Sequence, residues 1–262
     1  MHHSPTLFKV YIGIDYSGAK TPDDGLPGLR VYRAVLDHAP REILPSAGRS
    51  RYWTRRGLAL WLEQQLNQTR PTLVGIDHSF SFPDCYFERY GINSWPDFLE
   101  DFHRHWPTDE QGVSVERVRQ GQYGMGTVRS GNARWRRIAE QRAGAKSVFH
   151  FDVPGSVAKS THAGLPWLRH LRLRLGNQVH FWPYDGWSAP VGSSLIAEAY
   201  PALYSHDFPR NGRTQDQQDA YAIAAWLRQT DRVGSLRDYL APTLSSHERT
   251  VAVTEGWILG VR

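Results

Sequence analysis

Two short segments of the chain repeat one pattern. In each, an apolar run ends in aspartate, and a serine follows with one residue between them. The first covers residues 12–17 (IGIDYS) and the second covers residues 74–79 (VGIDHS). Apolar runs of this kind predict buried strands. A helix predicted between them allows a parallel crossover, and parallel neighbours end at the same edge of a sheet. The pattern therefore predicts that Asp15 and Asp77 lie together at that edge.

Neighbouring carboxylates have a direct chemical consequence. Each raises the pKa of the other unless a cation lies between them. Mg²⁺ or Mn²⁺ is the expected cation, because both ions prefer hard oxygen ligands. The alternative is that each aspartate only begins a turn, where this residue is common. Because the same context occurs twice, we favour a shared site at Asp15 and Asp77.

A late helix supplies further acids. Residues 216–219 (DQQD) precede an apolar face, and residues three apart share a helix face. Asp219 is in line with Ile223 on the side that packs against the sheet, where an acid needs a partner. Asp216 has an alternative role, since acids are favoured in the first turn by the helix dipole. Glu198 is a fifth candidate, with a strand-end salt bridge as its alternative. The predicted metal ligands are Asp15, Asp77, Asp216 and Asp219, and the predicted catalytic residues are these four and Glu198.

The elements that must position these acids follow from the apolar pattern. Strands are predicted at residues 7–15, 29–36, 73–77, 179–182 and 195–199, and the first two are antiparallel because their link is short. Residues 40–48 are predicted as a loop. Helices are predicted after Thr54, over 95–106, from a first turn at Pro166, and from a capping box at Thr214 and Gln217 to about residue 229. This order predicts an α/β fold with a mixed central sheet and helices on both faces, in a single domain over residues 1–262.

Composition excludes several classes of protein. The 262 residues include one cysteine, Cys85, which excludes an internal disulfide, a multi-cysteine zinc site and an iron–sulfur cluster built by this chain alone. No apolar run reaches the ~20 residues that span a bilayer. The N-terminal residues lack the pattern of a secretion signal. We therefore expect a cytoplasmic protein with no membrane partner.

Positive charge is concentrated in one segment. The window from Arg117 to Lys146 carries eight basic residues and one acid, whereas the whole chain carries a net charge of +5. This predicts a basic, Gly- and Arg-rich insertion at about 107–150 that binds nucleic acid; the alternative is a solvated loop with one arginine-rich helix. Lys159 and His162, which precede Gly164, are predicted to face the phosphate. The other predicted nucleic-acid contacts are Arg117, Arg119, Arg129, Arg134, Trp135, Arg136 and Arg137.

The order of these motifs resembles the ribonuclease-H-like superfamily, in which one acid ends the first strand, a second ends the fourth strand and a late helix supplies one or two more. Asp15, Asp77, Asp216 and Asp219 fit the pattern of its Holliday-junction resolvases. The chain is more similar to a bacterial and archaeal family of uncharacterised, predicted nucleases in that superfamily. The similarity runs through residues 13–15 (GID), 75–77 (GID), 155–157 (GSV), 164–166 (GLP), 198–201 (EAYP), 216–220 (DQQDA) and 255–258 (EGWI).

The resemblance implies hydrolysis of a phosphodiester with two metal ions. Asp15 would be the central ligand, Asp77 and Asp219 would each complete the shell of one ion, and Asp216 or Glu198 would add a ligand or hold a water. The nucleic acid is undecided between DNA and RNA. Two alternatives stay open. One is a non-catalytic nucleic-acid-binding protein, and the other is a phosphotransferase or ATPase like the actin-like relatives of the fold.

Overall fold

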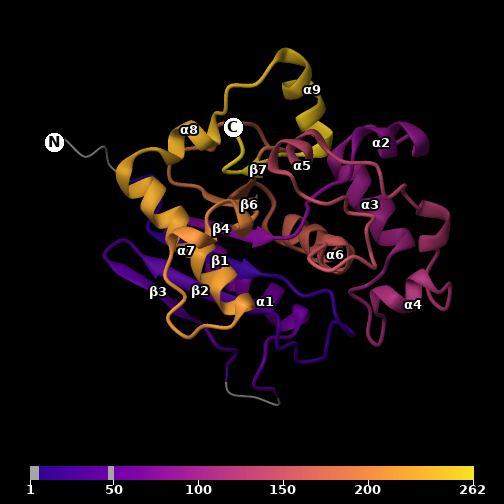
Figure 1. Cartoon of the computed structure of the whole chain (residues 1–262), viewed down its shortest axis with the longest axis horizontal. Coiled ribbons are helices and arrows are strands. Elements are labelled where there is room, and N and C mark those ends of the chain that lie inside the picture. The colour runs from indigo at the N-terminus through magenta and orange to yellow at the C-terminus, as the bar shows by residue number, and fades with distance from the viewer. Residues whose placement is uncertain (1–5, 47–49) are drawn as a thin grey trace.

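The computed structural model describes residues 6–46 and 50–262 and shows an α/β fold around a mixed sheet. The strand order is β3-β2-β1-β4-β6-β5, with β7 paired to β6 (Figure 1). β2 is antiparallel to β1 and β3, and the pairs β1–β4, β4–β6, β5–β6 and β6–β7 are parallel. The strands are β1 (Val10–Asp15), β2 (Arg30–Val35), β3 (His38–Glu42), β4 (Thr72–Asp77), β5 (Val179–Phe181), β6 (Ser194–Ala199) and β7 (Ile258–Leu259).

Helices lie on both faces of the sheet, as predicted. The α-helices are α1 (Arg55–Leu66), α2 (Asp84–Tyr90), α3 (Trp95–His105), α4 (Val115–Arg119), α5 (Ile138–Ala143), α6 (Ala158–Leu175), α7 (Gln215–Val233), α8 (Leu236–Leu240) and α9 (Ser246–Glu255). Short 3₁₀ turns are η1 (Gly126–Arg129), η2 (Gly176–Gln178), η3 (Pro201–Leu203) and η4 (Ser205–Asp207). No helix of the described ranges is long and apolar enough to span a membrane.

Successive side chains of each strand point to opposite faces of the sheet, so the strands contribute to two core layers. Ile12 and Val74 belong to the cluster that contains the apolar faces of α1 and α6. Tyr11 and Leu73, their neighbours in sequence, belong to the cluster that contains the apolar face of α7. This is the two-residue period of a strand that is buried on both faces. In Figure 1, α7 crosses β1 and β2.

Most predicted elements are present, with two corrections. The capping box of α7 forms as predicted, and Thr54 accepts a hydrogen bond from the backbone N–H of Gly57 at the start of α1. The predicted loop through Pro40 contains β3 instead, which is an edge strand and therefore tolerates proline. Gly48, in the same predicted loop, lies outside the described residues. The helix predicted to start at Pro166 starts at Ala158, and Pro166 lies in its interior. Every residue from 160 to 168 of α6 is buried, so tertiary packing outweighs the local cost of proline.

Candidate functional site

The two strands that end in aspartate are parallel neighbours. β1 and β4 pair in a register that sets Gly13 opposite Gly75 and Asp15 opposite Asp77. Neighbouring strands are ~4.8 Å apart, so these two aspartates leave the sheet side by side. Both are partly exposed. The structure therefore confirms the predicted parallel crossover and brings Asp15 and Asp77 to one edge.

The paired glycines allow α7 to lie directly on these strands. A Cβ atom at Gly13 would lie 2.2 Å from the carbonyl oxygen of Ala220, and one at Gly75 would lie 2.6 Å from Cγ2 of Ile223. A side chain at either position would push the helix away from the sheet. The close approach carries the first turns of α7, with Asp216 and Asp219, toward the same edge.

The position of the α7 carboxylates is set by local contacts. Oδ1 and Oδ2 of Asp219 accept hydrogen bonds from Nε2 of Gln215 at 3.0 and 2.8 Å. The carboxylate of Asp216 and the hydroxyl of Ser17 both flank Gly28, where a Cβ atom would lie 3.6 Å from Oδ2 of Asp216 and 3.7 Å from Oγ of Ser17. Asp216 therefore lies beside the loop that follows β1.

Electrostatics couple the four aspartates. Burial, and then repulsion from Asp77, Asp216 and Asp219, raise the pKa of Asp15 well above its usual value, against a smaller opposing effect of Arg30. Burial, repulsion from Asp219 and repulsion from Glu198 do the same to the pKa of Asp77. Burial also raises the pKa of Asp219. Mutual repulsion of this kind is expected where several carboxylates share a site without a cation.

The protein itself does little to neutralise this charge. In residues 6–46 and 50–262, the side chains of Asp15, Asp77 and Asp216 have no hydrogen-bonded or ion-paired partner. Their hard oxygen atoms are the donors that Mg²⁺ and Mn²⁺ prefer. As they stand, however, no three His, Cys, Asp or Glu side chains of the described chain are arranged to hold a metal ion. The chemistry of the donor set fits a divalent ion, but the positions of the four carboxylates do not form a ligand cluster.

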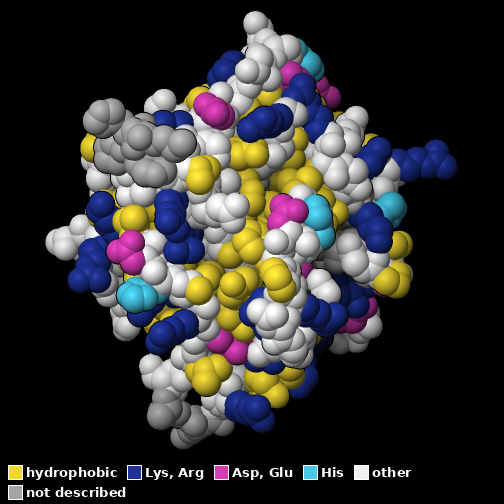
Figure 2. All heavy atoms as spheres, turned by 60° about the vertical axis from the view of Figure 1, so that its left-hand side comes forward, with side chains coloured by type: hydrophobic (Ala, Val, Ile, Leu, Met, Phe, Trp, Pro, Cys, Tyr) yellow, Lys and Arg dark blue, Asp and Glu magenta, His cyan; other side chains and the backbone are white. Residues whose placement is uncertain are grey.

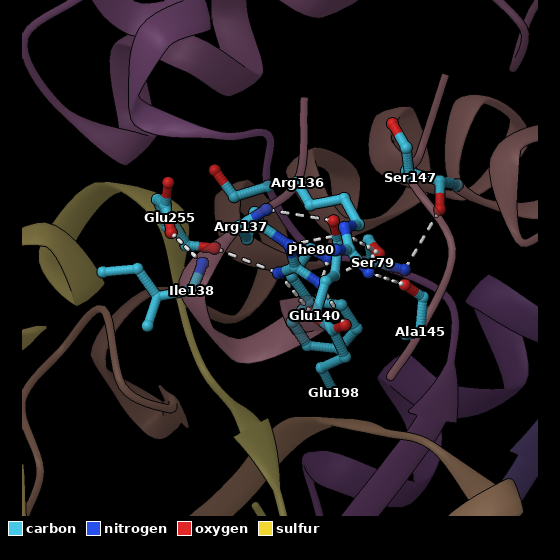
Figure 3. A network of polar contacts seen from close by, with 12 residues as sticks. Ser79, Phe80, Arg136, Arg137, Ile138, Glu140, Ala145, Ser147, Glu198 and Glu255 are labelled. Carbon is cyan, nitrogen blue, oxygen red and sulfur yellow. Dashed lines mark hydrogen bonds and ion pairs between the residues drawn. The ribbon is translucent and has the colours of Figure 1, made fainter. Parts of the chain in front are cut away.

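Glu198 has a different environment from the four aspartates. Both of its carboxylate oxygens accept hydrogen bonds from Arg137, at 2.8 and 2.5 Å, and Oε2 also accepts one from the backbone N–H of Phe80 at 3.0 Å (Figure 3). The strand-end salt bridge, stated above as the alternative role of Glu198, is therefore the arrangement observed. A buried carboxylate held this way is not free to bind a metal ion unless Arg137 is released.

Arg137 is the centre of a buried network rather than part of a nucleic-acid surface. Its side chain is completely buried, and it also donates hydrogen bonds to Glu140, to the hydroxyl of Ser79 and to the backbone oxygen of Glu255 (Figure 3). His162 is 1% exposed and is surrounded by aromatic rings. Arg137 therefore has no exposed surface for the predicted contact with nucleic acid, whereas His162 is almost fully buried at the wall of a pocket described below.

The remaining basic candidates are at the surface, but several are paired with acids. Arg119 pairs with Glu116 and Asp152, Arg129 pairs with Asp101, and Lys159 lies 3.4 Å from Glu116. Arg134 and Arg136 are exposed, Arg117 donates to the backbone oxygen of Gly112, and Trp135 is half-buried with Arg89 over its ring. Figure 2 turns the opposite side forward, away from α4, and on that face Lys and Arg side chains are scattered. Tertiary pairing therefore reduces the charge that the sequence concentrates in this segment.

Two residues near the acids were not among the predicted site residues. The buried guanidinium of Arg55 donates hydrogen bonds to the backbone oxygens of residues 17, 19 and 20, and so fixes the loop after Asp15. Lys146 and Asp77 both line a narrow cleft with about 20 Å³ of free volume. Lys146 stands in the basic window, so charge was a signal for it, whereas nothing local marks Arg55.

Comparisons with known proteins identify no relative. No protein-family model, curated protein or solved structure matches the chain. The functional argument therefore rests on the four aspartates and their surroundings.

Proposed function

We propose that this chain is a nuclease of the ribonuclease-H-like type that hydrolyses phosphodiester bonds with Mg²⁺ or Mn²⁺. One observation carries the proposal. Asp15 and Asp77 stand in register at the ends of neighbouring parallel strands, and the helix with Asp216 and Asp219 packs on the same strands. Clustered carboxylates without a protein cation to neutralise them are a metal-site arrangement.

The order of the acids along the chain supports the ribonuclease-H-like assignment. Asp15 ends β1, and α7 is a late helix. Because the unpredicted strand β3 precedes it, Asp77 ends the fourth strand in chain order. The first strand, the fourth strand and a late helix are the three positions that the resemblance implies.

The metal ions, when bound, would supply a hydroxide nucleophile and stabilise the leaving oxygen. Asp15 interacts electrostatically with all three other aspartates, so it would be the shared ligand. Asp77 and Asp219 would hold one ion each, and Asp216 would hold a further ligand position or a water.

Cations at the margin of the acids support a phosphate substrate. Arg30 lies close enough to lower the pKa of Asp15, Arg210 acts in the same direction on Asp219, and Lys146 lines the cleft beside Asp77. A phosphodiester is an anion, and it needs such cations to approach a cluster of carboxylates. These residues are on different elements, so only the fold brings them together.

The test is cleavage of a panel of single-stranded, duplex and branched DNA, RNA and RNA–DNA hybrid. Each substrate is incubated with Mg²⁺, Mn²⁺ or chelator, with the wild-type chain and with Asp15→Asn. We expect metal-dependent cleavage that the substitution abolishes. Asp24→Asn is the matched control, because Asp24 lies outside the acid cluster and accepts its hydrogen bonds from Thr21. Absence of cleavage on every substrate, or equal cleavage by Asp15→Asn, would refute the proposal.

A further inference from the structure

A second pocket lies in the Gly- and Arg-rich segment, away from the four aspartates. It has a free volume of about 310 Å³, at the lower end of the ~300–1,000 Å³ typical of ligand sites. Trp106, Phe149 and Phe151 are its aromatic walls, His162 lines its interior, and Arg119 and Arg129 also line it. The residues that line this pocket are mainly aromatic and include two arginines, unlike those of the cleft beside Asp77.

The rings are arranged as flat walls. Trp106 and Phe151 are nearly parallel, with an angle of 10° between their planes and 6.1 Å between their centres. The ring of His162 lies 4.5 Å from Trp106 and 4.6 Å from Phe151, and it is steeply inclined to both. The guanidinium of Arg119 lies 4.4 Å from the centre of Phe151. The centres of Trp106 and Phe151 are closer than the ~7 Å that a ring inserted between them needs. A planar ligand would therefore stack against the partly exposed ring of Phe151.

Two glycines of the basic segment allow these walls to form. A Cβ atom at Gly131 would lie 2.2 Å from the ring of Phe149, and one at Gly126 would lie 2.6 Å from Cε2 of Trp106. Side chains at these positions would displace the rings. Gly126 and Gly131 therefore allow the backbone to pack closely against the rings of Trp106 and Phe149.

The pocket also contains two buried polar atoms without partners. Nε1 of Trp106 and Nε2 of His162 make no hydrogen bond within the part of the chain that the structure describes. His162 Nδ1 lies 2.8 Å from the backbone oxygen of Ala158, so it is the nitrogen that carries the proton, and Nε2 is an acceptor. Burial lowers the pKa of His162 to about 3, which keeps the ring neutral. One donor and one acceptor left unpaired in a buried site are costly unless a ligand satisfies them.

These polar atoms match the edge of a nucleobase. Each base carries hydrogen-bond donors and acceptors around a planar ring, and sequence-tolerant binding of single strands relies on aromatic stacking. Arg119 and Arg129 add positive charge for the phosphates of the strand, although both arginines are already paired with acids.

Helix α6 connects the pocket to the acid edge. Its backbone at Lys159 touches Gly18, in the loop after Asp15, and Gly164 packs against the ring of His78, which follows Asp77. His162 lies on the same helix between these two contacts. Both contacts and His162 lie within residues 159–164 of α6, a rise of about 7.5 Å along the helix axis.

We propose that this pocket binds one unpaired base of a nucleic-acid strand whose neighbouring phosphate lies at the four aspartates. The contact between the phosphate and the four aspartates rests on the proposed function. Binding of a base in the pocket does not depend on it. It names the substrate class as a strand with at least one unpaired base.

The experiment measures binding in chelator, so that cleavage cannot contribute. Fluorescence anisotropy follows labelled 12-nucleotide single strands of DNA and of RNA, and the matching duplexes, with the wild-type chain, Phe151→Leu and Thr127→Trp. Phe151→Leu keeps an apolar side chain and removes one aromatic face. Thr127 is exposed and lines the pocket, so Thr127→Trp obstructs it without removing a core side chain. Tyr239→Leu, a half-buried aromatic residue on α8, is the control.

We expect the single strands to bind more tightly than the duplexes, and both pocket variants to weaken single-strand binding by roughly 5- to 150-fold, the effect of losing one base–aromatic stack. Tyr239→Leu should bind like the wild type. A fully abasic strand of the same length should bind the wild-type chain more weakly by a similar factor, and it should bind Thr127→Trp as weakly as the intact strand does. Circular dichroism checks that each variant is folded, and Thr127→Trp decides the question if Phe151→Leu is not.

Equal affinities for Thr127→Trp, Tyr239→Leu and the wild-type chain would overturn the inference, as would absence of single-strand binding. Failure of the proposed function gives a different result. In that case the pocket variants still lose single-strand binding in chelator, but no substrate is cleaved in Mg²⁺ or Mn²⁺.

Discussion

Replacing Asp15 with asparagine should stabilise the metal-free protein at neutral pH. The carboxylate of Asp15 is surrounded by those of Asp77, Asp216 and Asp219, and its pKa is raised by burial and by this repulsion. A group whose pKa is higher in the folded state than in the unfolded state binds more protons when folded, so the stability of the fold decreases as pH rises above the ordinary aspartate range. An amide of the same shape carries no charge and removes this effect.

The register of β1 and β4 sets the magnitude. Two unit charges ~5 Å apart interact by about 3 kcal/mol at an effective dielectric constant of ~20. Asp15 and Asp77 are both partly exposed, so solvent and salt reduce this, and relief of about 1–3 kcal/mol is expected. For a chain of this size, that corresponds to a rise in Tm of roughly 2–12 °C.

Thermal unfolding in chelator and in Mg²⁺ tests the prediction without a substrate. In chelator, the Tm of Asp15→Asn should exceed that of the wild type, and the difference should grow from pH 5 to pH 8. In Mg²⁺ at ~100 times its dissociation constant, the wild type should gain about 3 kcal/mol by linkage, and the variant should gain much less. Asp24→Asn is the control. Hydrogen bonds from Thr21 lower the pKa of Asp24, so that substitution should not stabilise the fold.

Two results would refute this reasoning. If Asp15→Asn unfolds at a lower temperature than the wild type in chelator, the repulsion between the aspartates does not dominate at this edge. If Mg²⁺ raises the Tm of both proteins equally, Asp15 is not a ligand.

Three further substitutions test other parts of the structure. Gly13→Ala sets a Cβ atom 2.2 Å from the backbone of Ala220, so we expect a loss of ~1–3 kcal/mol in urea unfolding and a smaller rise of Tm in Mg²⁺. Arg55→Ala leaves three backbone oxygens without their donor; a loss of ~2–4 kcal/mol and faster proteolysis within residues 16–21 should follow, and unchanged proteolysis would contradict this role. Burial lowers the pKa of His162 to about 3, so its contribution to stability is lost as pH falls from about 6.5 toward 3. His162→Gln should therefore show a shallower decrease of Tm with acid than the wild type, and parallel curves would count against it.

The acids themselves were predictable because their signals are local. A run of apolar residues that ends in aspartate specifies both a buried strand and the residue at its end, and the capping box at Thr214 specifies where α7 begins. The two-residue period of a strand and the 3.6-residue period of a helix are visible within ten residues of sequence. For this reason β1, β2, β4, β6, α1 and α7 and the positions of four aspartates were foreseen.

Other features had no local signal, or had a misleading one. Pro40 reads as a loop, but it occupies the edge strand β3, where its missing N–H costs nothing. Pro166 reads as the start of a helix, but burial of the preceding turns of α6 extends the helix to Ala158. In both cases the local secondary-structure preference of proline is a weak influence, and tertiary packing overrides it.

The amino-acid sequence by itself determined which strands end in acid, where the last helix begins and where basic residues are concentrated. Only the tertiary structure decided which charges neutralise one another. Arg137 and Glu198 are 61 residues apart and form a buried ion pair, whereas Asp15, Asp77 and Asp216 remain without partners among the described residues. Periodicity is a property of neighbouring residues, but charge pairing depends on which surfaces meet when distant segments pack, and that information is spread over the whole chain.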